Sequence, residues 1–197
     1  MKRLLAGVVA IVSIVSMPAV AQAPNPVRGT IEKVDGPVLS IKEKDGTVAT
    51  VKLTENAQVF GVVTATVADI KVGDFIGVGA MPQPDGSQKA IQVTIFAPSQ
   101  RGLGEGFRPW DRPNSTMTNG SVDAAVEGVN GRTLTVKYKG GEQKIVIAED
   151  ATIRAYLPGD KGELKPGAHV AVTRPEKATD GSLQATRINV GRNGAVP

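Results

Sequence analysis

The sequence predicts an all-β protein made of two small five-stranded barrels that are related by an internal repeat. The first observation behind this prediction is that residues 34–46 align with residues 129–141, with six of thirteen positions identical. The second is that short stretches rich in apolar and β-branched residues alternate with glycine-containing turn pairs throughout both copies. Together they indicate one β unit written twice.

Further matching blocks keep the same order along the chain. They pair residues 53–59 with 147–153, 70–73 with 164–167, and 85–87 with 180–182, at offsets of 94 or 95. Because a collinear set of matches at one period is the signature of duplicated structure, the repeat covers nearly all of both copies.

Each copy is expected to form five strands. Turns are predicted at Asp35-Gly36, Asp45-Gly46 and Asp85-Gly86, and in the second copy at Asn130-Gly131, Gly140-Gly141 and Asp180-Gly181, because these pairs supply positive φ angles. The strands predicted between them are residues 27–34, 38–44, 47–53, 75–80 and 90–95, and in the second copy 143–147, 169–173 and 183–190.

An irregular connection is expected after the third strand of each copy, over residues 54–73 and 148–167. Thr66 and Asp69 have the spacing of a capping box around a single helical turn. In the second copy, Pro158 and Gly159 argue against a helix.

Three strands, an irregular connection and two more strands suit a partly closed five-stranded barrel of OB type. The predicted domains are residues 27–96 and 122–190, separated by a linker over 97–121 and followed by a tail over 191–197. A domain of this size buries only roughly 60% of its unfolded surface, so we expect the two barrels to pack together.

The first 21 residues have the pattern of a secretory signal peptide. Lys2 and Arg3 precede an apolar run over residues 4–15, which is too short to span a bilayer. Two overlapping A-x-A sites follow, and cleavage after Ala21 is favoured over cleavage after Ala23, because the latter places Pro24 beside the scissile bond. The protein is therefore expected in the periplasm or outside the cell, with no transmembrane segment in the mature chain.

Charge and cysteine content narrow the function classes. After removal of residues 1–21, 21 Lys and Arg face 19 Asp and Glu, which leaves about +2. A net charge this small does not indicate a dedicated nucleic-acid binder. The absence of cysteine excludes disulfides, thiol catalysis, thiolate metal sites and lipid modification of an N-terminal cysteine.

No catalytic, cofactor or metal site emerges from the motifs. His169 is the only histidine, and it aligns with Phe75, which favours a packing or strand-edge position over a catalytic base. The glycines of residues 101–106 lack the spacing and flanking elements of a dinucleotide loop. No calcium-loop pattern occurs among the carboxylates.

The segment between the copies carries the candidate binding residues, Phe107, Arg108, Trp110 and Arg112. It is rich in Gly, Pro and Arg, yet it contains two large aromatic rings, which a free linker seldom keeps in water. Either the rings dock against the barrels or they anchor a partner, with the arginines adding charge-assisted contacts. Docking is favoured because marginal barrels gain from extra apolar burial.

Residues 29–36, 69–74 and 85–87 resemble motifs of exported bacterial β-repeat domains that form a family of unknown function. The resemblance covers both copies but not the segment between them, and it implies a fold and an envelope location but no chemistry. In the second copy Ala168 replaces Asp74, which weakens any role for that carboxylate.

The leading functional hypothesis is therefore a non-enzymatic exported module that binds a partner or an envelope component through the cleft between the copies and the linker. An OB-type binder of oligosaccharide or nucleic acid is one alternative. A hydrolase that relies on carboxylates alone is the other.

Overall fold

A computed structural model of the chain describes residues 24–127 and 132–197; the predicted signal peptide and the Asn130-Gly131 turn lie outside them. The fold is all-β, as predicted. Its strands are β1 (Val27–Asp35), β2 (Val38–Glu43), β3 (Val48–Thr64), β4 (Phe75–Pro82), β5 (Gln88–Ile95), β6 (Gly106–Pro109), β7 (Thr116–Glu127), β8 (Thr133–Tyr138), β9 (Gly141–Pro158), β10 (His169–Val172), β11 (Glu176–Lys177) and β12 (Leu183–Gly191).

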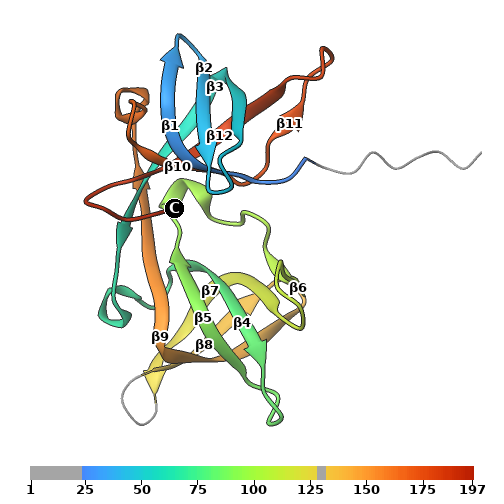
Figure 1. Cartoon of the computed structure of the whole chain (residues 1–197). Coiled ribbons are helices and arrows are strands. Elements are labelled where there is room, and N and C mark those ends of the chain that lie inside the picture. Colours follow the sequence, from blue (N-terminus) through green and yellow to red (C-terminus); the bar gives the residue numbers. More distant parts are fainter. Residues whose placement is uncertain (1–23, 128–131) are drawn as a thin grey trace, which may run out of the picture.

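The strand pairings close into two rings of five strands each, one above the other in Figure 1. The first ring runs β1-β2-β3-β12-β10 and returns to β1. The second ring runs β7-β8-β9-β5-β4 and returns to β7. In each ring one pairing is parallel, β3 with β12 and β5 with β9, and the other pairings are antiparallel.

Each ring encloses its own apolar core. Ile31, Ile41 and Ile188 are among the fully buried side chains of the first core. Leu134 and Val136 contribute to the second, from alternate positions of β8. Both cores consist of aliphatic side chains and alanine, so burial of apolar surface is the main stabilising term in each ring.

The division of the chain between the rings differs from the expectation that residues 27–96 and 122–190 each close by themselves. The first ring takes β1–β3 from the first copy and β10 and β12 from the second. The second ring takes β4 and β5 from the first copy and β7–β9 from the second. The copies have exchanged their last strands, and the second ring is one continuous segment inserted between the third and fourth strands of the first.

The exchange follows from the length of β3 and β9, which continue through half of each stretch expected to be irregular. Val59, Phe60 and Val62 are buried and keep β3 extended. Past the end of its pairing with β2, residues 60–64 of β3 pair antiparallel with residues 154–158 of β9. This shared ribbon carries the chain from one ring into the other, so β4 joins the second ring rather than folding back on the first.

The predicted turns within the described residues are confirmed. Gly36, Gly46, Gly86, Gly140 and Gly181 all have positive φ. In the last predicted turn of each copy an aspartate accepts hydrogen bonds from the serine two positions later: Asp85 from Ser87, and Asp180 from Ser182. These bonds hold the pKa of both carboxyl groups below the usual value.

Short 3₁₀ helices follow both long strands. In η1 (Val67–Asp69), Asp69 accepts hydrogen bonds from the backbone and hydroxyl of Thr66, which confirms the predicted helical turn. The second copy also has such a turn, η3 (Lys161–Glu163), contrary to the prediction from Pro158 and Gly159. Those residues end β9, and the helix begins after them with Asp160 as its N-cap.

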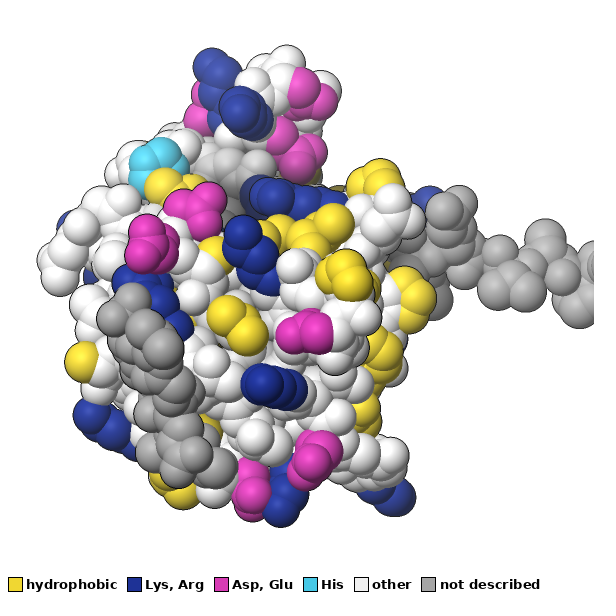
Figure 2. Space-filling view, turned by 90° about the horizontal axis from the view of Figure 1, so that it is seen from below, with side chains coloured by type: hydrophobic (Ala, Val, Ile, Leu, Met, Phe, Trp, Pro, Cys, Tyr) yellow, Lys and Arg dark blue, Asp and Glu magenta, His cyan; other side chains and the backbone are white. Residues whose placement is uncertain are grey.

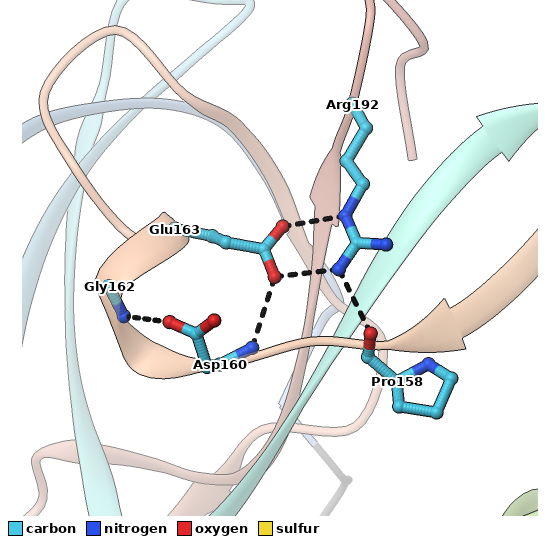
Figure 3. Close-up of polar contacts among 5 residues, drawn as sticks. All are labelled: Pro158, Asp160, Gly162, Glu163 and Arg192. Carbon is cyan, nitrogen blue, oxygen red and sulfur yellow. Dashed lines mark hydrogen bonds and ion pairs between the residues drawn. The ribbon is translucent and has the colours of Figure 1, made fainter.

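An ion pair fastens the second of these connections (Figure 3). Arg192 donates from Nε and Nη2 to the Glu163 carboxylate at 2.7 Å each, and from Nη2 to the Pro158 carbonyl at 2.9 Å. The guanidinium lies over Gly61, where a Cβ would overlap it. The end of the chain is thereby bonded to both the shared ribbon and η3.

Candidate functional site

The segment between the copies is more ordered than its composition predicts. It contains η2 (Pro98–Gln100) and β6, and β7 begins at Thr116, inside the region expected to be a linker. β6 pairs with β7 at the edge of the second ring. Proline has no backbone N–H to donate within a sheet. Pro109 stands at the last position of β6, so it ends the strand without interrupting the pairing before it.

Trp110 lies against the second ring. Its six-membered ring covers Gly79 of β4 so closely that a Cβ there would overlap it. The Trp110 backbone N–H donates to the Ser115 carbonyl at 3.0 Å, and the Ser115 hydroxyl donates to the Arg112 backbone carbonyl at 2.6 Å. These two bonds close the loop after β6. Trp110 is half-buried, so this ring docks internally, whereas Phe107 remains 43% exposed.

A cleft of about 490 Å³ lies between the two rings; we call it the central cleft. One wall comes from β1, β10, β12 and the start of the loop after β10, and the other from β4, β5, β6 and β7. Tyr156 of the shared ribbon and Trp110 also line it. Its volume falls within the range of about 300–1,000 Å³ that is usual for small-ligand sites.

Arginine dominates the charge of the central cleft. Six arginines line it, from four strands and two loops: Arg28, Arg108, Arg112, Arg154, Arg174 and Arg187. The only carboxylate side chain among the lining residues is that of Asp111. None of the salt bridges within residues 24–127 and 132–197 involves these arginines. The cleft therefore carries a concentrated positive charge that the surrounding protein leaves largely uncompensated.

Three of the arginines form a close group. The Nη2 atoms of Arg108 and Arg174 lie 3.5 and 3.4 Å from the position of a Cβ on Gly104. Burial, followed by the charge of Arg174, lowers the pKa of both Arg108 and Arg187. Both guanidinium groups remain cationic at neutral pH because the ordinary arginine value is so high.

The outer surface offers a contrast. On the face shown in Figure 2, Lys and Arg side chains are interspersed with Asp and Glu side chains. Outside the cleft, Lys137 pairs with Asp123 at 2.6 Å. The positive charge of the central cleft is therefore a local arrangement, in a protein whose formal net charge is only +4 before any processing.

The predicted binding residues are divided between two neighbouring places. Arg108, Trp110 and Arg112 line the central cleft. Phe107 instead lines a shallow, mainly apolar groove outside it, together with Trp110 and several prolines. Sequence reasoning missed Arg28, Arg154, Arg174 and Arg187, because no local motif marks them and only the exchange of strands brings them together.

His169 lies on the outside of the first ring, at an exposed position of β10. Its Nδ1 is 3.0 Å from the Thr30 hydroxyl on the neighbouring strand. The aligned Phe75 is buried on β4 of the second ring. His169 lies outside the central cleft, which agrees with a strand-surface position.

Within the described ranges, no group of three or more His, Asp or Glu residues is placed to hold a metal ion. The same part of the chain contains no helix that is long and apolar enough to cross a membrane. No protein-family model, curated protein or solved structure matches this chain.

Proposed function

We propose that this protein is an exported, non-enzymatic binding module of the bacterial envelope, and that it holds an anionic ligand in the central cleft. The observation that carries the proposal is the group of six arginines that line the cleft with one carboxylate side chain among them. The predicted signal peptide supports the location, and the resemblance to exported β-repeat domains agrees with it.

A purely structural role would not explain the arginine group. Like charges that are partly desolvated destabilise the folded state, and a structural cluster would be expected to include carboxylate partners. A bound anion removes this repulsion and accepts charge-assisted hydrogen bonds. Arginine also suits carboxylate and phosphate groups because its planar guanidinium can bind them through two parallel hydrogen bonds.

We further infer that each ring is an OB-like barrel and that the two arose from one repeated unit. Five strands that close with a single parallel pairing, in the same order in both rings, support this inference. So do the matching positions of Gly29 and Gly120, where a Cβ would overlap the carbonyls of the aligned Lys42 and Lys137.

Calorimetric titration of the mature protein with inorganic phosphate and citrate, at low ionic strength, tests the function. Binding should weaken as salt rises, because the contacts are ionic. The variant R174A,R187A should bind at least tenfold more weakly, whereas K165A,K177A removes the same charge outside the cleft and should bind as the wild type does. Equal binding by both variants, or no binding of either anion, would contradict the proposal.

A further inference from the structure

Residues that line the central cleft carry most of the buried polar atoms that lack a hydrogen-bond partner. The described part of the chain has five such side-chain atoms, and four belong to residues that line the cleft: Gln100 Nε2, Asn119 Oδ1, Arg187 Nε and Asn189 Oδ1. Buried polar groups in proteins are normally paired, since an unpaired one has lost its hydrogen bonds to water without replacement. Their concentration in one cavity points to a ligand.

The orientation of two of these groups is fixed by their other ends. Asn119 donates from Nδ2 to the Leu103 carbonyl at 2.9 Å, which leaves its Oδ1 as the free acceptor. Gln100 accepts at Oε1 from the Ala97 backbone N–H at 3.1 Å, which leaves its Nε2 as the free donor. The asparagine and glutamine residues are at most 5% exposed, so their side chains are held in place.

The four unpaired atoms include both hydrogen-bond donors and acceptors. Gln100 Nε2 and Arg187 Nε donate, whereas Asn119 Oδ1 and Asn189 Oδ1 accept. Inorganic phosphate in its dianionic form can satisfy the donors but carries a single hydroxyl hydrogen, so it leaves at least one of the two acceptors without a donor. A ligand that fits all four must carry hydroxyl groups as well as negative charge. Trp110 and Tyr156 add aromatic surface to the same cavity.

We propose that the ligand is an acidic sugar, with a carboxylate or phosphate group bound by Arg108, Arg174 and Arg187. Its hydroxyl groups donate to Asn119 and Asn189, and the aromatic side chains contact the apolar face of the sugar ring. This inference rests on the proposed function, since it specifies which anion the same cleft holds. A cavity of about 490 Å³ leaves room for more than one sugar unit.

The test is a calorimetric comparison of five probes with the mature protein: glucuronate, glucose 1-phosphate, glucose, inorganic phosphate and a short oligothymidylate. Glucuronate or glucose 1-phosphate should bind at least tenfold more tightly than both glucose and inorganic phosphate. Whichever of these two probes binds more tightly indicates whether the acidic group of the natural ligand is a carboxylate or a phosphate.

A variant at Asn189 separates the sugar contacts from the charge. Asn189→Leu should weaken sugar-acid binding about tenfold and leave phosphate binding unchanged, while the matched variant N56A, at an exposed asparagine, should alter neither. Asn189→Thr is a second variant with the residue found at the aligned position 94, in case the leucine disturbs folding. Melting temperatures close to the wild type would show that both proteins are folded.

The possible outcomes separate the two proposals. Equal affinity for phosphate and sugar acids, lost together in R174A,R187A, would overturn the acidic-sugar inference and leave the anion-binding function standing. Tighter binding of oligothymidylate than of any sugar would overturn the inference in favour of nucleic acid. Failure of every probe to bind would overturn both.

Discussion

The two walls of the central cleft are built from equivalent positions but differ in charge. On the first ring the wall carries Arg28 and Arg187, whereas the positions with equivalent strand pairing in the second ring are Asn119 and Gln92. Glycines that follow Arg28 and Asn119 make the same close approach to the neighbouring strand. The backbone is therefore alike where the side chains differ, which shows that the arginines are not required to form a ring.

The two connections between the rings, which contain η1 and η3, also differ in charge. The first is held by hydrogen bonds between Thr66 and Asp69. The second adds the ion pair of Glu163 with Arg192, and the first copy has Ala97 at the position that aligns with Arg192. Both connections therefore have a capped helical turn, and only the second has the ion pair.

The largest expected effect concerns the exchange of strands. Lys52 on β3 pairs with Gln184 on β12 in the parallel pairing of the first ring. Because the chain has no cysteine, K52C,Q184C places two thiols at adjacent strand positions without competitors. We expect this variant to form an intramolecular disulfide on oxidation, seen as faster migration in a non-reducing gel and a loss of two mass units.

The matched control is K52C,K89C. Lys89 is the residue that aligns with Gln184, and it pairs with Val146 in the second ring. This variant should stay reduced if the copies have exchanged strands. A disulfide in K52C,K89C and none in K52C,Q184C would show that each copy closes by itself.

The next effect concerns Trp110, which has no counterpart on the first ring. Thr173 occupies the position that aligns with Gly79, so an indole cannot lie there in the same way. Trp110→Ala should lower the free energy of unfolding by about 2 kcal/mol, less than the 3–5 kcal/mol of a fully buried ring. Chemical unfolding would measure this change, and F107A should change stability by less than about 0.5 kcal/mol.

The tryptophan fluorescence of the wild type provides an independent measurement. Emission should be blue-shifted and partly shielded from a soluble quencher, because the ring rests on β4. Full accessibility to the quencher, together with unchanged stability of W110A, would show that the indole is free in solution.

A smaller effect is expected at the second connection. Glu163→Gln should lower the free energy of unfolding by about 1 kcal/mol near neutral pH, since the ion pair is partly exposed. The Arg192 guanidinium, aided by the Asp160 backbone, lowers the pKa of Glu163 below its usual value of 4.5. A lowered pKa means that the folded state favours the ionised carboxylate.

This stabilisation is therefore complete above pH 4.5 and declines as the pH falls through the lowered pKa. The unfolding curves of wild type and E163Q should differ at neutral pH and converge in acid. Asp35→Asn provides the control, because Asp35 and Lys33 form a more distant pair with highly exposed side chains. A difference between wild type and E163Q that persists unchanged in acid would assign the effect to something other than the carboxylate charge.

The smallest effect is expected at His169, the counterpart of the buried Phe75. His169→Phe should change the free energy of unfolding by no more than about 0.5 kcal/mol and should leave anion binding unchanged, because the side chain is exposed and outside the cleft. Urea unfolding and calorimetry measure the two quantities. Loss of anion binding in a folded H169F protein would give this histidine a functional role.

The sequence by itself predicted the turns and the positions of most strands, but not β6 or the full lengths of β3 and β9. Alternating apolar residues and turn pairs such as Asp35-Gly36 act over a few positions, so they can be recognised without knowing what packs against them. The same local signals found Trp110 as a docked ring, since a large aromatic side chain within a Gly- and Pro-rich segment requires a contact.

Only the tertiary structure decided which strands share a ring and where the cleft lies. The strands of residues 27–64 could pair with the last two strands of either copy, because both copies carry nearly the same strand pattern. The shared ribbon of β3 and β9 decides which of the two pairs is used. The arginine group depends on that choice, since Arg28, Arg108 and Arg187 are far apart in the sequence and lie together only after the exchange. Contacts between distant segments depend on the pairing of whole strands, and no local pattern encodes them.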